Sequence, residues 1–244
     1  MKDSVLVIFL KNSIIMINQN NPILIRAPKK IRKIWWWVIA AIIVLLFMFV
    51  FWPPQNPTTS TPVAKTQKVD ENILYSQSKN EPHQGEVSAK ARIVEFGDFE
   101  CPYCEQSFPI VREILQKYQG KIYFVFRDFP LSDIHSHALH AAEAANCAAE
   151  QGKFWEMHDK LFMNQANLED ADFQKYAQSI GLKTAQFNSC FNSGKYLTKI
   201  NQDIDDGVGF GVRATPTFFI NGYKIEGVIP RDLFMQLIDK ALAE

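Results

Sequence analysis

Residues 91–104 read ARIVEFGDFECPYC, and this stretch decides the fold of the chain. Its first six residues form a largely apolar run with β-branched side chains, which predicts a central β-strand. A helix-like run follows, so Cys101 and Cys104 lie at the start of a predicted helix. The free backbone N–H groups of a first helical turn favour the thiolate form of a cysteine over the thiol. Because two cysteines three residues apart can close a disulfide, and because the thiolate attacks disulfides, the motif predicts a redox-active site.

The elements after the motif extend this strand into a predicted mixed sheet with helices packed on it. Residues 121–127 (KIYFVFR) are rich in β-branched and aromatic side chains and predict a second strand. A helical block covers about residues 134–206. Strand character returns at residues 217–220, and the Asn221-Gly222 pair that follows is a strong hairpin signal. A return strand and a closing helix complete the predicted α/β order.

The composition fits one folded domain with additional segments. The chain has 244 residues, of which 47% are hydrophobic, so a sizeable core can be buried. The formal net charge at pH 7 is zero, which argues against a partner held by a basic surface. We therefore predict no binding to nucleic acid.

A membrane anchor is predicted at residues 34–52. This run of 19 residues has no charged side chain, and tryptophans stand at both of its ends. As a helix it would extend over roughly 28 Å, close to the thickness of the hydrocarbon core of a bilayer. Basic side chains precede the run within residues 29–33, and the next charge after it is Lys65. The positive-inside rule then places the N-terminus in the cytoplasm and the later residues outside.

A cleaved signal peptide is the alternative interpretation of this run. The apolar region of a signal peptide usually has about 7–15 residues and ends at a site of small residues. Here the run is longer, and Trp52-Pro53-Pro54 closes it. We therefore predict a retained anchor, a single pass through the inner membrane and an extracytoplasmic domain.

The chain is predicted to have four parts. In chain order they are a cytoplasmic segment at 1–33, the anchor at 34–52, a Pro- and Thr-rich linker at 53–82 and a folded domain at 83–244. The first segment holds two apolar runs, at 5–10 and 13–17, and each is too short to span a membrane.

Residues 83–244 resemble the membrane-anchored bacterial members of the DsbA-like branch of the thioredoxin superfamily. The resemblance is carried by the strand and motif at 93–104, by the helical insertion, by the ATPTFF segment at 214–219 and by the closing hairpin and helix. It implies a thioredoxin-like α/β fold whose mixed sheet carries a DsbA-type helical insertion at about 134–206, preceded by one N-terminal transmembrane helix. It also implies thiol-disulfide oxidoreductase activity, and no cofactor is predicted.

The two cysteines of the motif have separate predicted roles. Cys101 is predicted to be the nucleophile and the more exposed sulfur, and Cys104 the resolving thiol. A structural disulfide or half of a zinc site is the alternative, but zinc usually takes four ligands and the chain has no second CxxC motif. Pro102 and Tyr103, which lie between the cysteines, are predicted to tune the redox poise. In the superfamily that this region resembles, strong oxidants often have histidine at the position of Tyr103.

Three further residues receive roles from the same resemblance. Pro216 resembles the cis-proline that faces the disulfide, and its cis bond would expose the backbone of Thr215 to an extended substrate. An ordinary trans proline in a turn is the alternative. Glu95 stands where the family has an acidic residue, and a buried carboxylate there would have a raised pKa and could relay protons to Cys104. The alternative is a glutamate that faces solvent on an edge strand.

The helical block holds two other sets of candidate residues. Cys147 and Cys190 are predicted to form a stabilising second disulfide, which an extracytoplasmic location allows. Two buried, unreactive thiols are the alternative. His135, His137 and His140 suggest a metal site, but such histidines are more often surface residues, so we predict no metal.

Three functions are compatible with these residues. The first is oxidation of thiols in secreted or membrane proteins outside the cytoplasm, for which the resemblance implies reoxidation by a quinone-linked membrane partner. The second is a disulfide reductase or isomerase on the same fold, supplied with electrons by a membrane reductase. The third is a non-enzymatic tethered chaperone. The redox potential separates the first two, and the effect of Cys101→Ser separates the third.

Overall fold

The computed structural model divides the chain into two units, residues 1–62 and residues 63–244. It describes residues 6–10, 13–18, 21–25, 68–78 and 81–244. The predicted anchor at 34–52 lies outside these described residues. None of the helices in the described part combines the length and the apolar character that crossing a bilayer requires.

The described part of the first unit is a three-stranded antiparallel sheet. Its strands are β1 (Leu6–Leu10), β2 (Ser13–Asn18) and β3 (Asn21–Ile25), and β2 lies in the middle. β-branched and aromatic side chains favour extended backbone, and each of the three strands contains at least two of them. The two short apolar runs of the sequence are thus strands of one sheet, which we did not predict from the sequence.

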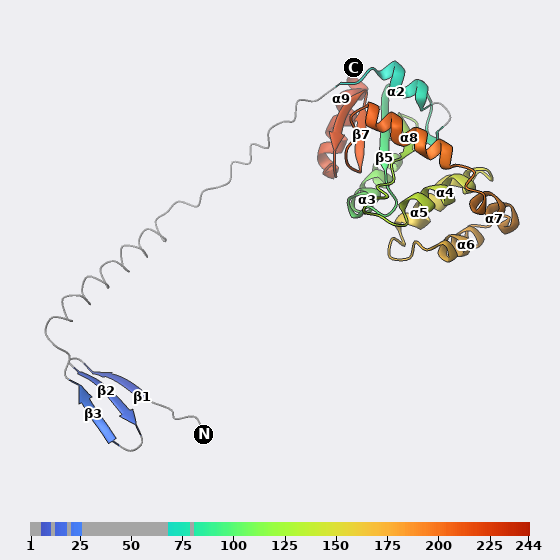
Figure 1. The fold of residues 1–244 in the computed structure, drawn as a ribbon. Helices are drawn as coiled ribbons and strands as arrows, with labels where there is room; N and C mark the ends of the chain where they lie inside the picture. The colour runs from blue at the N-terminus through green and yellow to red at the C-terminus, as the bar shows by residue number, and fades with distance from the viewer. Residues whose placement is uncertain (1–5, 11–12, 19–20, 26–67, 79–80) are drawn as a thin grey trace. The chain divides into compact units, whose positions relative to one another are not determined.

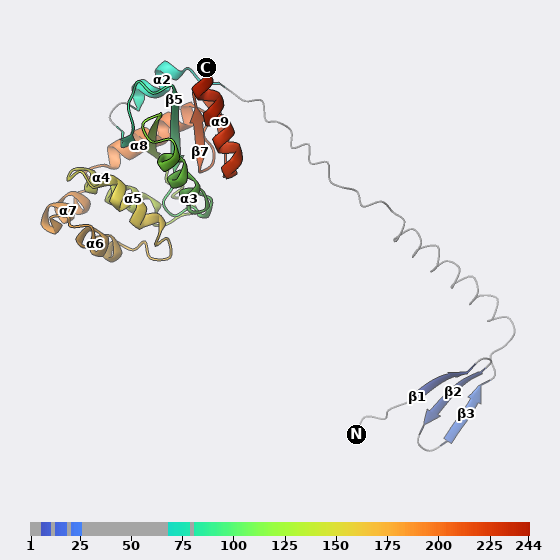
Figure 2. The ribbon, with the colours of Figure 1, turned by 180° about the vertical axis from the view of Figure 1, so that it is seen from behind.

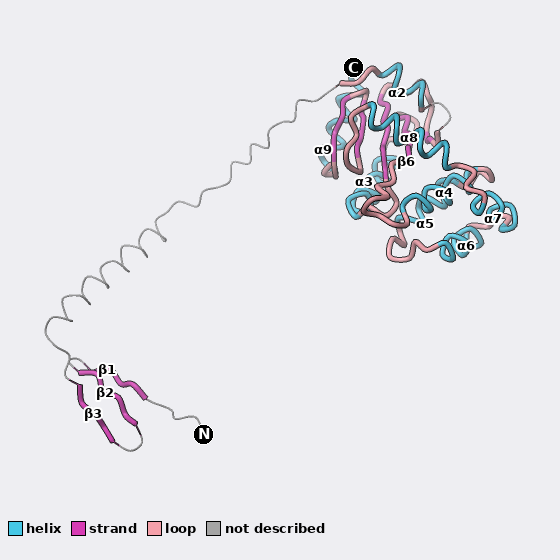
Figure 3. The backbone as a smooth tube through the Cα atoms, viewed as in Figure 1, coloured by secondary structure: helices cyan, strands magenta, loops and turns pink. Residues whose placement is uncertain are grey.

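The second unit is built on the mixed sheet that the sequence predicts (Figure 3). The strand order is β4-β6-β5-β7-β8, and the central strand β5 runs parallel to β6 and antiparallel to β7. The strand bounds are β4 His83–Gln84, β5 Ala91–Gly97, β6 Ile122–Asp128, β7 Thr217–Ile220 and β8 Tyr223–Glu226.

The helices of this unit fall into a group around the sheet and a separate helical lobe. Their bounds are α2 Glu71–Gln77, α3 Pro102–Lys117, α4 Ala138–Ala149, α5 Phe154–Phe162, α6 Asp170–Ser179, α7 Thr184–Asn192, α8 Leu197–Gly209 and α9 Arg231–Ala243. Figures 1 and 2 show α4 to α7 gathered together beside one end of the sheet, whereas α2, α8 and α9 lie along it. The elements α4 to α8 thus occupy the region where the sequence predicts a helical insertion.

Alternation along β5 sorts its side chains between two cores. Ile93 belongs to the core that β5 shares with α3, α9 and the helical lobe. Val94 and Phe96 point the other way, into a smaller core with side chains of α2. Because successive residues of a strand face opposite sides, Glu95 shares the face of Ile93. The carboxyl group of Glu95 therefore lies on the side of the sheet that α3 covers.

The C-terminal part of the predicted linker at 53–82 is folded. Asp70 caps the first turn of α2 with its side chain, and Leu74 and Tyr75 are buried. The hydroxyl of Tyr75 donates to the backbone oxygen of Arg92 at 2.8 Å, and the guanidinium of Arg92 lies 3.5 Å from the centre of the tyrosine ring. These contacts join α2 to β5, so the domain begins before the predicted boundary at residue 83.

Candidate active site at the start of helix α3

The local sequence places Cys101 at the junction of β5 and α3. The helix begins at Pro102, whose fixed φ suits a first helical position, and Cys101 is the N-cap residue with extended backbone. The side-chain amide of Gln165 donates to the carbonyl oxygen of Cys101 at 3.0 Å and holds the loop from the helical lobe. Nothing in the sequence around Gln165 signals this role.

Both sulfurs of the motif are covered. Cys101 is 3% exposed and Cys104 is 1% exposed, and the two cysteines are not bonded to each other. Cys101 is the more exposed of the two, as predicted, but by only a small margin, because the protein covers both residues. Thr215 contributes to this cover, since its carbonyl oxygen lies 3.4 Å from the Cys101 sulfur.

Hydrogen bonds give Cys101 an unusually acidic thiol. The hydrogen bond from Cys104 and the backbone N–H groups of Tyr103 and Cys104 in the first turn of α3 lower the pKa of Cys101 to about 5, although burial opposes this shift. An ordinary cysteine has a pKa of about 8.5. Cys101 is therefore a thiolate at neutral pH, which is the nucleophilic form.

Cys104 has the opposite character. Burial raises the pKa of Cys104 well above its usual range, and the hydrogen bond to Cys101 and the charges of Cys101 and Glu95 add to this rise. The backbone N–H of Asp98 points at the Cys104 sulfur from 3.5 Å and acts the other way. The pair thus consists of one thiolate and one protonated thiol.

Glu95 is a buried acid on the central strand of the sheet. It is 3% exposed, and burial raises its pKa to about 8. β5 is flanked by β6 and β7 on its two sides, so the alternative of a solvent-facing glutamate on an edge strand is wrong. At neutral pH the side chain is largely protonated, so it has a proton to offer on the side of the sheet where Cys104 lies.

We expect Glu95→Gln to stabilise the fold in a pH-dependent way. The ordinary pKa of 4.5 applies to Glu95 in the unfolded chain, and the folded value is about 8, so folding takes up a proton between these pH values. The stability contributed by the neutral carboxyl is therefore complete below about pH 4.5 and is lost as the pH rises towards 8. Glutamine has no charge in either state, so the variant should be more stable than wild type at pH 8, by on the order of 2–4 kcal/mol, and similar to it at pH 4.

Denaturant unfolding of both proteins at pH 4, 6 and 8 measures this difference. Exposed Glu86 provides the control, because Glu86→Gln should not change the pH dependence of unfolding. A gap between Glu95→Gln and wild type that stays the same from pH 4 to pH 8 would contradict the assignment of a neutral buried carboxyl.

Thr215 and Pro216 lie where the family resemblance places them. The Thr215–Pro216 peptide bond is cis, so the alternative of a trans turn proline is wrong. Thr215 is 4% exposed, and its carbonyl oxygen is the group that contacts the Cys101 sulfur. Residues more than 100 positions apart in the sequence thus meet at one sulfur atom.

Asp98 is a residue of this site that we did not predict from the sequence. Its backbone contacts both cysteines: its carbonyl oxygen accepts from the Cys101 N–H at 3.2 Å, and its N–H points at the Cys104 sulfur. Its buried carboxylate accepts from the backbone N–H groups of Glu100 and Leu131, at 2.8 and 2.9 Å. An acidic residue in an apolar stretch three residues before a CxxC motif was the signal that could have identified it.

A comparison with protein families identifies the fold. A family model described as Thioredoxin matches residues 77–240, which is more than half of the chain. The chain belongs to the thioredoxin family.

Curated relatives match this chain over a limited part of their own length. The Na(+)/H(+) antiporter NhaA 3 of Salinispora tropica is 44% identical over 144 residues, which are 59% of this chain and 22% of that protein. The Na(+)/H(+) antiporter NhaA 1 of Mycolicibacterium vanbaalenii is 38% identical over 146 residues, which are 59% of this chain and 24% of that protein. The match thus spans less than a quarter of each relative, and antiport is a property of those whole proteins.

Solved structures share the thioredoxin fold with its helical lobe. A thioredoxin-like oxidoreductase from Silicibacter pomeroyi has a TM-score of 0.64 at 23% identity, covering 72% of this chain and 99% of that one. Oxidised BdbD from Bacillus subtilis has a TM-score of 0.63 at 22% identity, covering 73% and 98%. The alpha-DsbA1 of Wolbachia pipientis has a TM-score of 0.60 at 26% identity, covering 67% and 92%.

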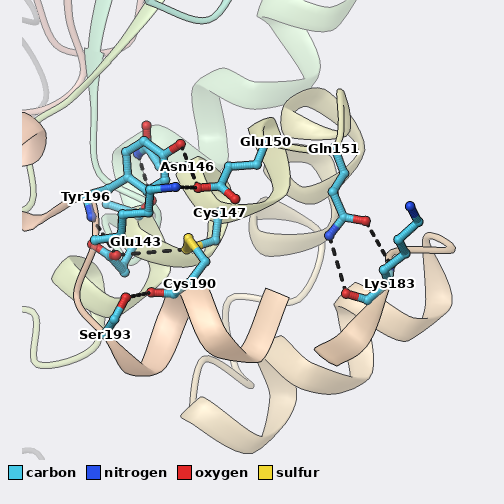
Figure 4. Close-up of a disulfide and its surroundings, with 11 residues drawn as sticks. Glu143, Asn146, Cys147, Glu150, Gln151, Lys183, Cys190, Ser193 and Tyr196 are labelled. Atoms are coloured by element: carbon cyan, nitrogen blue, oxygen red, sulfur yellow. Dashed lines mark hydrogen bonds and ion pairs between the residues drawn. A yellow bond between two sulfur atoms is a disulfide. The ribbon is translucent and has the colours of Figure 1, made fainter. Parts of the chain in front are cut away.

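The helical lobe of this thioredoxin-family domain contains a disulfide. Cys147 in α4 and Cys190 in α7 are bonded, with their Cα atoms 5.8 Å apart (Figure 4). Buried Glu143, one turn before Cys147, accepts from the backbone N–H of Tyr196 at 2.8 Å beside this bond. The alternative of two free thiols is therefore wrong, and the bond ties the ends of the lobe together.

We expect removal of this disulfide to destabilise the domain without touching the CxxC motif. The bridge closes a loop with a sequence separation of 43 residues. The loop entropy released in the unfolded chain should lower the free energy of unfolding of Cys147→Ala/Cys190→Ala by about 2–4 kcal/mol. Denaturant unfolding measures the change, and wild type with dithiothreitol-reduced cysteines should approach the variant. Equal stability of variant and untreated wild type would contradict a stabilising bridge.

The three clustered histidines have separate acidic neighbours. His135 Nδ1 lies 2.7 Å from a carboxylate oxygen of Asp98, and His140 Nδ1 lies 2.7 Å from Asp170. The backbone N–H of His137 donates to Glu100. In the described part of the chain, the one group that could hold a metal ion is Glu143 with Cys147 and Cys190, whose sulfurs are bonded to each other.

Proposed function

We propose that this thioredoxin-family chain is a thiol-disulfide oxidoreductase that exchanges a Cys101–Cys104 disulfide with thiols of secreted or membrane proteins. The observation that carries the proposal is the unequal pair of sulfurs at the start of α3. The pKa of Cys101 is lowered to about 5, and that of Cys104 is raised. Disulfide exchange needs one sulfur that attacks and leaves readily and a second that stays protonated in reserve.

In the oxidising direction, the exchange runs through one mixed disulfide. A substrate thiolate attacks Cys101, the Cys101–Cys104 bond breaks, and its electron pair leaves on Cys104. A second substrate thiolate then attacks the substrate sulfur of the mixed disulfide, and Cys101 leaves as a thiolate. The substrate loses two electrons and gains a disulfide, and the chain gains two electrons as a dithiol. The low pKa of Cys101 makes it a good leaving group in the second step.

Glu95 supports the proton movements of this cycle. Cys104 leaves as a thiolate in a buried site that disfavours its charge. The protonated carboxyl of Glu95, whose pKa is about 8, can supply a proton to that sulfur and recover it when the disulfide forms again. We propose this relay as the role of Glu95.

We propose net oxidation as the direction of the reaction. A lower pKa of the nucleophilic cysteine stabilises the reduced protein and so makes its disulfide more oxidising. The corresponding pKa is about 7 in thioredoxin and about 3.5 in the strong oxidant DsbA. The value of about 5 for Cys101 lies between them. We therefore expect an oxidant weaker than DsbA, in keeping with Tyr103 at a position where strong oxidants often have histidine.

The redox potential of the full-length chain tests this direction. The chain is equilibrated with glutathione buffers of defined ratio, its thiols are trapped by alkylation, and the reduced fraction is measured. We expect a potential between about −120 mV and −270 mV. A value at or below that of thioredoxin would replace the oxidase proposal with the reductase alternative.

We further propose that the domain acts outside the cytoplasm, on a membrane tether, with a quinone-linked membrane oxidase as its redox partner. The uncharged run at 34–52 with basic residues before it supports the tether, and the Cys147–Cys190 disulfide suits an oxidising compartment. Topology reporters fused after residue 244, together with alkylation of Cys101 in intact cells, test the location. A cytoplasmic reporter signal, or a Cys101 that rests reduced in cells, would contradict this proposal.

A further inference from the structure

The carboxylate of Asp98 poses an electrostatic problem for the active site. Its side chain has no exposed surface, and the backbone of the same residue touches both cysteines. The two oxygens accept three hydrogen bonds, from the N–H of Glu100, the N–H of Leu131 and the imidazole of His135. A buried negative charge this close to the motif would oppose the charged form of Cys101.

His135 is placed to compensate this charge. Its Nδ1 lies 2.7 Å from Asp98 Oδ2, and its side chain is only 14% exposed, so water screens the pair weakly. The charged or titratable groups that act on the imidazole are Asp98, Cys101 and Glu100. Burial lowers the pKa of His135, but the hydrogen bond and charge of Asp98, together with the charges of Cys101 and Glu100, raise it overall. An imidazolium and a carboxylate at this distance together carry no net charge.

We propose that His135 is a positioning residue for disulfide exchange, which as the cationic partner of Asp98 neutralises the buried carboxylate beside the motif and so favours the thiolate of Cys101. This inference rests on the proposed function and assigns that site a residue from outside the motif. In this proposal, the histidine that favours the Cys101 thiolate is His135, in the segment before α4. Strong oxidants of the superfamily often have their histidine at the position of Tyr103, between the two cysteines.

A measurement on the unmodified protein tests the coupling. If His135 favours the Cys101 thiolate, then by linkage the thiolate must favour protonated His135 by the same free energy. The chain has five histidines, so their imidazole resonances can be followed by NMR in the full-length protein and assigned with single His→Gln variants. We expect the pKa of His135 to be higher in the dithiol form than in the disulfide form by about 0.5–1 unit. Equal values in the two forms would overturn the proposal.

His135→Gln separates the charge from the hydrogen bond. Glutamine keeps an N–H donor for Asp98 but carries no charge, so a purely structural role should survive the change. We expect the pKa of Cys101, read from thiolate absorbance near 240 nm, to rise by about 0.5–1 unit, a roughly three- to ten-fold loss of thiolate below the midpoint. The matched control is His140→Gln, which removes an exposed histidine paired with Asp170 and should leave Cys101 unchanged. An unchanged Cys101 in His135→Gln would also overturn the proposal.

A second substitution shows whether His135 acts through Asp98. In Asp98→Asn/His135→Gln the uncompensated carboxylate is gone, so the pKa of Cys101 should return towards the wild-type value. A Cys101 pKa that stays raised in the double variant would overturn the route through Asp98. If a variant fails to fold, the NMR comparison on the wild-type chain still decides. The proposed function is tested separately, by disulfide exchange with proteins. The coupling between His135 and Cys101 is measured by their pKa values, so it can be present or absent whether or not the chain exchanges disulfides.

Discussion

Cys101→Ser should abolish disulfide exchange, with a rate loss of at least roughly 10³-fold. Serine is similar in size, but its hydroxyl has no accessible anionic form near neutral pH and cannot close an S–S bond with a substrate. The variant loses both the nucleophile and the leaving group whose pKa the site lowers to about 5. Oxidative refolding of a reduced, disulfide-containing protein by the full-length chain measures the effect.

Cys104→Ser is the matched comparison for this result. This variant keeps the acidic nucleophile but lacks the resolving thiol, so mixed disulfides between Cys101 and its substrates should accumulate and be visible on non-reducing gels. Two outcomes would contradict the proposed chemistry. One is full biological activity of Cys101→Ser, which would favour the tethered chaperone, and the other is adduct formation that does not depend on Cys101.

Arg127→Met should cause a large loss of stability. Arg127 lies near the end of β6 with a side chain that is 1% exposed, and its Nη2 lies 2.6 Å from Asp203 and 2.5 Å from Asp206 of α8. Methionine fills a similar volume but leaves the buried carboxylate of Asp203 without this partner. We expect the free energy of unfolding to fall by about 3–5 kcal/mol.

Denaturant unfolding of the full-length chain measures this loss. The control is Arg231→Met, because Arg231 forms an exposed ion pair with Glu113 that solvent screens, and its loss should change stability little. Similar stabilities of the two variants would show that the Arg127 network does not hold α8 against the sheet. The folded fraction of Arg127→Met should still exchange disulfides, since its contacts do not include Cys101 or Cys104.

Short-range patterns in the sequence were enough to predict most of the thioredoxin-like sheet. The run before the CxxC motif forms β5, the KIYFVFR segment forms β6 with a shift of one residue, and Asn221-Gly222 joins β7 to β8. Each signal lies within a few residues, where side-chain alternation and turn preference act directly. The two reactive cysteines were predictable for the same reason, because their spacing and the flanking strand and helix are local.

Contacts between distant charged residues could not be predicted in this way. Asp98 and His135 are 37 positions apart, and Arg127 and Asp203 are 76 positions apart. Each of these side chains alone resembles a solvated surface charge, and only the packing of the helical lobe and α8 against the sheet buries them. Helix α2 could not be predicted for the same reason. Its sequence is polar, like that of a linker, and the contact of Tyr75 with Arg92 that holds it to β5 joins distant residues.

The two edge strands of the five-stranded sheet affect how readily the domain would aggregate with unfolded chains. At one border β4 is only two residues long, and at the other Lys68 bridges to Tyr223 while the N–H of Val69 donates to Gly222 at 2.9 Å. An uncovered border strand is a template for aggregation, because its free backbone groups accept any extended chain. These contacts pair part of the backbone at each border and so reduce that template. Under the proposed function, a client would be held by a mixed disulfide, which exchanges, and not by the addition of strands.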